Sequence, residues 1–139
     1  MAKTHIILAF ALAVVLPERS FSSDVELTAH FQEAFSTGYC VPEVLDKANV
    51  EHSRCNEAWK SPISTCAKET GLFEFVTNSE LSAEVWAARY EAEAYELTVC
   101  LFDVLGNGVN DPDNPDRVIY KAIIQYDDKL KEHEEAQLD

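Results

Sequence analysis

The chain of 139 residues carries 25 acidic and 11 basic side chains, which give a formal net charge of −14 at pH 7. This charge disfavours binding to nucleic acids and adhesion to anionic membranes, because their phosphates repel a negative surface. The length is that of a single domain and is sufficient to bury a hydrophobic core.

The first 22 residues have the layout of a signal peptide. Lys3 precedes an unbroken apolar run over 6–16, and Ser20 and Ser22 lie three and one positions before an expected cleavage after Ser22. The run has 11 residues, whereas a membrane-spanning helix needs about 20. We therefore predict a signal peptide over 1–22 and a secreted, extracellular domain over 23–139, with cleavage after Ser20 or Ser23 as the alternatives. This domain carries nine basic and 24 acidic residues, a net charge of −15.

The first helix of the domain is expected to begin at Ser23. Ser23 and Glu26 have the spacing of a capping box, in which each side chain satisfies a backbone N–H group of the first turn. The apolar positions that follow are Leu27, Phe31 and Phe35. Because these residues are four positions apart, they predict one buried helical face, and Gly38 is expected to end the helix.

Three shorter helices are predicted over 42–49, 51–59 and 61–71. Proline at position 42 suits the first residue of a helix, where its missing N–H group costs nothing. Ser61 followed by proline suits an N-cap and a first helical position, and glycine at position 71 suits a helix end. We interpret the apolar segment 72–76 (LFEFV) as a core-filling linker.

The dominant predicted element is a helix over 80–105, capped by Asn78 or Ser79 and ended by Gly106. Alternate spacings of four and three define a heptad-type seam of Leu81, Val85, Ala88, Ala92, Tyr95, Val99 and Phe102. A second apolar stripe consists of Trp86, Tyr90, Ala94, Leu97, Leu101 and Leu105. Because the two stripes make most of the circumference apolar, we expect this helix to be central and its heptad seam to be buried.

A turn-rich loop over 107–114 leads to the last predicted helix, which Asn114 and Pro115 should cap. The expected buried face of this helix consists of Ile119, Ala122, Ile123, Tyr126 and Leu130. The charged tail over 131–139 is expected to fray. The fold class predicted from these elements is all-α: a compact, disulfide-stabilised bundle of five or six helices around one long central helix.

Four cysteines lie in the expected domain: Cys40, Cys55, Cys66 and Cys100. An even number in a secreted domain predicts two disulfides, for which three pairings are open. If the chain folds back at 60–61, Cys55 and Cys66 come together. The favoured pairs are therefore Cys55–Cys66 and Cys40–Cys100.

The sequence shows no catalytic or metal-binding pattern, so we expect neither an enzyme nor a cofactor. The histidines of the domain stand alone on helical patterns: His30, His52 and His133. Three loop aspartates are close enough in sequence to suggest a calcium site: Asp111, Asp113 and Asp116. A calcium-binding loop of the EF-hand type requires glycine at its sixth position and glutamate at its twelfth, and both are missing here. A turn joining two helices fits these aspartates better.

In size, acidity and helix content the chain resembles the insect odorant-binding proteins, which carry small hydrophobic ligands. That family typically has six cysteines, two of them four positions apart, whereas this chain has four. The carrier function is therefore the alternative hypothesis.

Two segments carry another resemblance, HFQEAFSTGYC at 30–40 and AEVWAARYEAEAY at 83–95. Together with the signal peptide, the acidic domain and the four cysteines, they are similar to the anophensin and albicin family of anopheline mosquito salivary proteins. The resemblance implies an all-helical fold with two disulfides. It also implies a secreted salivary protein that evades host plasma defence by binding. Its target would be the C3 convertase of the alternative complement pathway or the contact (kallikrein–kinin) system.

The expected partner is a host plasma protein complex, and we expect the protein itself to be a monomer. The candidate contact residues are acids on the long helix and in the loop after it: Glu84, Glu91, Asp111, Asp113 and Asp116. Such groups attract cationic surfaces and raise the rate of association.

Overall fold

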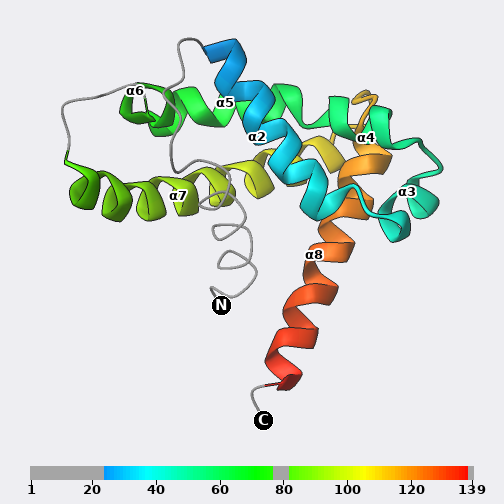
Figure 1. Cartoon of the computed structure of the whole chain (residues 1–139). Helices are drawn as coiled ribbons and strands as arrows, with labels where there is room; N and C mark the ends of the chain where they lie inside the picture. Colours follow the sequence, from blue (N-terminus) through cyan, green and yellow to red (C-terminus); the bar gives the residue numbers. More distant parts are fainter. Residues whose placement is uncertain (1–23, 77–81, 138–139) are drawn as a thin grey trace.

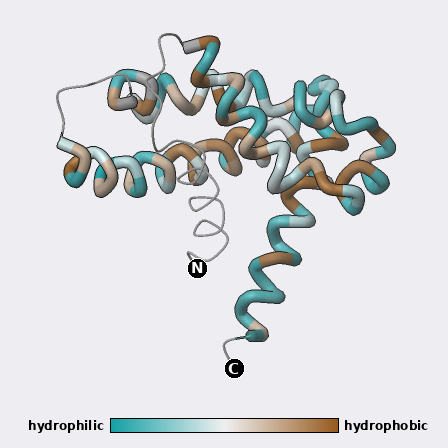
Figure 2. Tube along the Cα trace, in the orientation of Figure 1, coloured by the Kyte–Doolittle hydropathy of each residue, from teal (hydrophilic) through white to brown (hydrophobic). Residues whose placement is uncertain are grey.

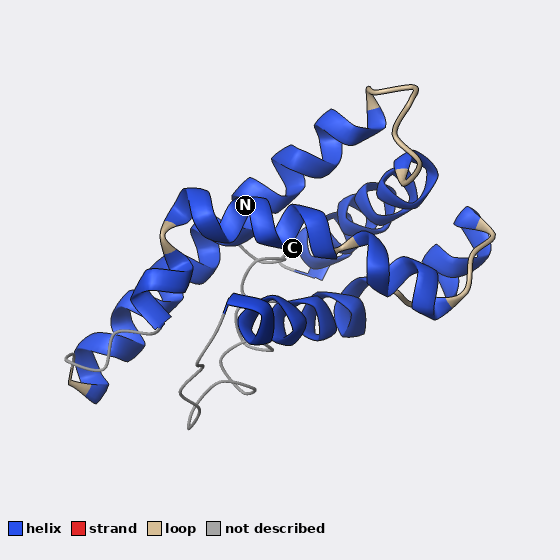
Figure 3. Ribbon diagram, turned by 90° about the horizontal axis from the view of Figure 1, so that it is seen from above, coloured by secondary structure: helices blue, strands red, loops and turns tan. Residues whose placement is uncertain are grey.

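In a computed structural model, residues 24–76 and 82–137 are described, and they form seven helices with no strand among them (Figures 1 and 3). The helices are α2 (Asp24–Tyr39), α3 (Pro42–Ala48), α4 (His52–Ala58), α5 (Lys60–Thr70), α6 (Leu72–Val76), α7 (Ala83–Val109) and α8 (Arg117–Gln137). The predicted all-α, disulfide-stabilised class is confirmed, with seven described helices where five or six were expected. The predicted signal peptide and the proposed caps Ser23, Asn78 and Ser79 lie outside the described residues.

The helices pack as a compact body from which the end of α8 extends. Helix α2 lies across α5, and α7 packs against both α5 and α8 (Figure 1). Helix α3 packs against α8, where Lys129 pairs with Glu43 at 2.9 Å. The part of α8 that points away from the body is mainly hydrophilic (Figure 2). None of the described helices is both long and apolar enough to cross a membrane.

The predicted apolar face of α2 is confirmed as part of the core. Leu27, Phe31 and Phe35 are all fully buried. The ring of Phe35 stacks on Trp59, with 5.1 Å between ring centroids, and Tyr39 contacts the same indole at 5.8 Å. Aromatic rings from α2 and from the α4–α5 junction thus form the centre of the core.

The three short helices lie close to their predicted positions, but the start of α5 differs. Trp59 has αR dihedral angles, so the helical path continues from α4 into α5, which begins at Lys60. Ser61 is therefore not an N-cap. Gly71 ends α5 with a φ of 74°, a conformation that favours glycine, as predicted.

The segment 72–76, interpreted from the sequence as a core-filling linker, is a short helix, α6. Its aromatic and branched residues have a low intrinsic propensity for helix, but tertiary packing overrides such preferences. Leu72 is fully buried and Phe75 nearly so, which confirms that the segment fills the core.

The long helix α7 is present, but the prediction that its heptad seam is buried is wrong. The buried face is the second stripe, including Tyr90, Ala94, Leu97, Leu101 and Leu105. Val85, Tyr95 and Val99 of the seam are 48%, 47% and 46% exposed, and Phe102 is half-buried. Helices α5 and α6 lie on one side of α7, so it borders the core rather than being enclosed by it (Figure 1).

Both ends of α7 differ from the prediction. The helix begins at Ala83, with Ser82 as the N-cap whose hydroxyl accepts a hydrogen bond from the Val85 N–H group at 3.3 Å. It continues through Gly106 to Val109. Helix α8 begins at Arg117, two residues later than the Asn114–Pro115 cap predicts.

The two glycines near the end of α7 should respond oppositely to alanine. A Cβ atom at Gly106 meets nothing within 4 Å, whereas one at Gly108 would lie 2.7 Å from Cδ2 of Tyr120. We expect Gly106→Ala to stabilise the fold by about 0.5–1 kcal/mol, because alanine loses less backbone entropy in a helix. Gly108→Ala should destabilise it by about 1–3 kcal/mol through overpacking. Urea denaturation measures both, and a stabilising Gly108→Ala would contradict the close contact with Tyr120.

The disulfides join Cys40 to Cys55 and Cys66 to Cys100. The favoured pairing of Cys55 with Cys66 and Cys40 with Cys100 is therefore wrong. It depended on a reversal of the chain at 60–61, but the helical path continues through Trp59. Eleven residues of helical path separate Cys55 and Cys66 by about 16 Å, well beyond the distance of about 7 Å that a disulfide can span between Cα atoms.

Helix α8 buries the predicted positions Ile119, Ala122 and Ile123, while Tyr126 and Leu130 are half-buried. The helix continues to Gln137, so residues 131–137 of the charged tail are helical in the structure.

A buried carboxylate joins α8 to α2. Asp127 accepts a hydrogen bond from the Tyr39 hydroxyl at 2.8 Å and pairs with Lys131 at 3.2 Å. Burial, and then the charge of Asp127, raise the pKa of Tyr39 above its usual range. The phenol therefore stays protonated and keeps donating to the carboxylate.

Candidate protein-binding surface

The five predicted contact acids do not form a single patch. Glu84 and Glu91 are exposed on the first half of α7, and Asp111 and Asp113 are exposed in the loop after it. Eighteen helical positions separate Glu91 from Val109, the last residue of α7, a distance of about 27 Å along the axis, and Asp111 lies beyond that end. A single binding site for all five would therefore have to extend along the whole of α7.

Asp116 has a structural role that the sequence did not reveal. Its carboxylate is half-buried and forms an ion pair with Arg54 of α4. The Tyr120 hydroxyl donates its hydrogen bond to the Ala58 carbonyl at 2.9 Å, and its oxygen lies 3.4 Å from Asp116 Oδ2. Burial, and then the charge of Asp116, raise the pKa of Tyr120. Asp116 thus fixes the start of α8 against α4.

The loop aspartates stabilise turns, as the sequence suggested. Asp111 accepts a hydrogen bond from the Asp113 N–H group at 3.0 Å, and Asn114 accepts one from the Asp116 N–H group at 2.8 Å. Among the described residues, no cluster of three or more histidine, cysteine or acidic side chains is placed to hold a metal ion. The histidines in the described part of the chain lie on three different helices: His30 on α2, His52 on α4 and His133 on α8.

Five residues of the predicted heptad seam are exposed and form an apolar stripe on the side of α7 opposite its buried residues. We call Val85, Ala88, Ala92, Tyr95 and Val99 the outer face of α7; all five are exposed. Val85 and Val99 are 14 residues apart, about 21 Å along the axis. Isolated exposed apolar residues are ordinary, but a contiguous stripe often marks an interaction site.

Acidic side chains border the outer face on both sides. Successive residues of an α-helix are 100° apart, which places Glu84 and Glu91 along one edge and Glu96 and Asp103 along the other. All four are exposed. Sequence reasoning selected Glu84 and Glu91 but missed Glu96 and Asp103, because it placed the seam between them in the core.

Arg89 is the basic residue beside the outer face, and it points toward α6. Its guanidinium carbon lies 5.1 Å from the Phe75 ring centroid, and it pairs with Glu93 at 3.9 Å. Phe75 stacks on Trp86, which stacks on Tyr90 at 5.1 Å. These contacts hold α6 on the inner side of α7 and engage Arg89 there, so the edges of the outer face are predominantly negative.

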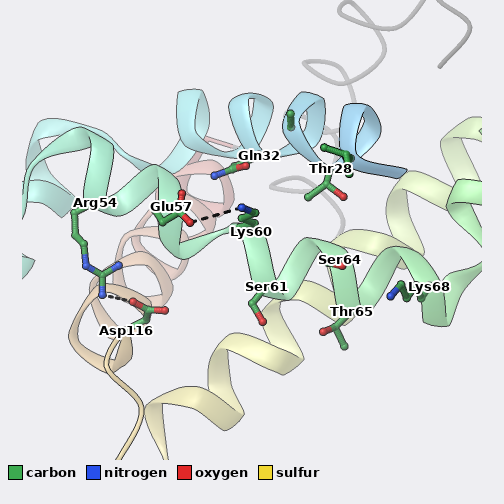
Figure 4. Close-up of a pocket in the computed structure, with 12 residues that line it drawn as sticks. Thr28, Gln32, Arg54, Glu57, Lys60, Ser61, Ser64, Thr65, Lys68 and Asp116 are labelled. Atoms are coloured by element: carbon green, nitrogen blue, oxygen red, sulfur yellow. Dashed lines mark hydrogen bonds and ion pairs between the residues drawn. The ribbon is translucent and has the colours of Figure 1, made fainter. Parts of the chain in front are cut away.

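A groove of about 800 Å³ lies between α2 and α5 (Figure 4). Thr28 and Gln32 line it from α2, while Ser61, Ser64 and Lys68 line it from α5. Arg54 and Lys60 also reach it, but Arg54 pairs with Asp116, and Lys60 lies 4.0 Å from Glu57. Val25 and Ala29 add apolar surface to this lining, and the groove is open to solvent. Carriers of hydrophobic ligands instead enclose most of the ligand surface in a cavity.

No protein-family model, curated protein or solved structure matches this chain.

Proposed function

We propose that this chain is a secreted, non-enzymatic binding protein that inhibits host plasma defence by occupying a protein surface. The proposed target is the C3 convertase of the alternative complement pathway or a component of the contact system. The single observation that supports a binding function is the exposed outer face of α7 with acids at both edges. The resemblance to the anophensin and albicin family supplies the class of target.

The two disulfides agree with passage through an oxidising compartment, where such bonds form and persist. Secretion into a host would then bring the acidic surface into contact with plasma proteins. Its charge favours cationic partners and accelerates their approach.

Inhibition measured in human plasma should be stoichiometric and should reach a plateau, because binding consumes no substrate. Mass spectrometry of the target should show no cleavage or modification. Raising the salt concentration from about 50 to 300 mM should slow association far more than it changes dissociation, because salt screens the charges that steer the encounter. A cleaved target would overturn the non-enzymatic interpretation, and an association rate independent of salt would remove the role of charge.

Carriage of a small ligand is the second candidate function, and the groove between α2 and α5 is the observation in its favour. Displacement of a fluorescent fatty-acid probe tests it. Stoichiometric submicromolar binding that Lys68→Glu weakens would support a carrier. A probe that binds only weakly, and equally to both proteins, would oppose one.

A further inference from the structure

We propose that the outer face of α7 binds a basic amphipathic α-helix of the partner protein. This inference deepens the proposed function and rests on it, since it assigns the chemistry of the partner to the same surface. Three features of the outer face support it, namely its shape, its spacing and the charge of its edges.

Shape and spacing favour a helical partner. The five residues of the outer face are spaced alternately by three and four, the pattern that lets side chains of one helix insert between those of another. The stripe is two heptad positions wide and about 21 Å long, which suits a second helix crossing at a shallow angle. The small side chains of Ala88 and Ala92 at its middle leave room for larger apolar residues of the partner.

Charge determines which helix fits. Glu84 and Glu91 border one edge, Glu96 and Asp103 border the other, and Arg89 is engaged by Phe75 and Glu93. Lysines or arginines flanking the apolar stripe of a partner helix would face these four acids. Charge complementarity of this kind specifies partners in helix pairs.

The same acids disfavour a second copy of this chain as the occupant. A symmetric pair would bring Glu84 and Glu91 of one copy near the same residues of the other. Each copy carries a net charge of −15 over 23–139, so the two copies would also repel each other as whole molecules.

A synthetic peptide tests the inference with the secreted protein. The probe is a fluorescein-labelled 21-residue helix with leucine at the heptad core positions and lysine at the flanking positions. Two control peptides have the same composition in scrambled order, or glutamate in place of lysine. We expect fluorescence anisotropy to show micromolar binding of the probe and at least tenfold weaker binding of both controls. NMR shift changes should centre on Ala88, Ala92 and Val99.

Two matched variants separate local charge from total charge. Glu91→Lys combined with Glu96→Lys should weaken peptide binding at least tenfold. Asp46→Lys combined with Glu135→Lys changes the net charge equally at exposed sites on α3 and α8, and it should weaken binding less than threefold. Equal effects of the two variants would overturn the inference, as would a dimer in sedimentation that Val99→Asp dissociates.

The same experiment distinguishes this inference from the proposed function. Peptide binding without any inhibition in plasma would refute the proposed function and leave the assigned surface intact. Inhibition in plasma that Glu91→Lys and Glu96→Lys leave unchanged would refute the assignment of the partner helix and leave the proposed function intact.

Discussion

Leu101→Asp is expected to unfold the protein, whereas Val99→Asp, two residues away on α7, should leave it folded. Leu101 is fully buried, so aspartate there loses the packing of leucine and places a charge in the core. Together these effects should cost more than about 5 kcal/mol, which is comparable with the total stability of a typical domain, about 5–15 kcal/mol. Far-UV circular dichroism and urea denaturation measure the outcome.

Val99→Asp should cost less than about 1 kcal/mol, because the side chain is exposed and the change adds only repulsion from Glu96 and Asp103, about one turn away on either side. The folded variant should nevertheless lose binding, since it places a charge in the middle of the outer face. Val99→Ala and Leu101→Ala are the matched neutral controls. An unfolded Val99→Asp beside a folded Leu101→Asp would mean that α7 is rotated by half a turn from the orientation described here.

The rotation of α7 shows where sequence reasoning succeeded and where it failed. The periodicity revealed both apolar stripes but could not show which one faces the core, because a buried seam and an exposed seam can have the same heptad spacing. Side-chain size was the available signal: the buried stripe holds Leu97, Leu101 and Leu105, whereas the seam holds Val85, Ala88 and Ala92. Larger apolar side chains gain more from burial, so the heavier stripe belongs in the core.

Single residues predicted the ends of helices correctly where the residue type restricts the backbone to one conformation. Gly71 and Pro42 each suit a single backbone geometry, and both helices obey them. Ser61 was misleading, because a serine can cap a helix or lie within one, and the contacts of Trp59 with Phe35 and Tyr39 fix the α4–α5 junction. Those contacts join distant parts of the chain and leave no local trace in the sequence.

Only part of the candidate binding surface could be predicted, because it too depends on contacts between distant parts of the chain. Exposed acids were recognisable as a class, but their grouping depends on which way α7 faces. Asp116 was counted as a contact residue, although Arg54, 62 positions earlier, pairs with it in the fold. The spacing of two such residues in the sequence does not predict their ion pair, which forms only when the helices pack together.

Removing the Cys66–Cys100 disulfide should have the other large effect on stability. This bond joins α5 to α7 across a sequence separation of 34 residues, whereas Cys40–Cys55 spans 15. Each disulfide stabilises the fold by lowering the entropy of the unfolded chain. This effect predicts a stabilisation of about 4 kcal/mol for the longer loop and about 3 kcal/mol for the shorter one. Cys66→Ala combined with Cys100→Ala should therefore lower the melting temperature by roughly 15 °C, more than Cys40→Ala combined with Cys55→Ala.

The pairing itself can be read directly from a tryptic digest under non-reducing conditions. Cleavage after the lysines and arginines places each cysteine in its own peptide, namely the one that ends at Lys47, 55–60, 61–68 and 90–117. The structure predicts that the peptide ending at Lys47 is linked to 55–60 and that 61–68 is linked to 90–117. A digest that instead links 55–60 to 61–68 would require the chain to reverse at Lys60. In that case α4 and α5 could not continue through Trp59, and the stabilising cross-link between α5 and α7 would not exist.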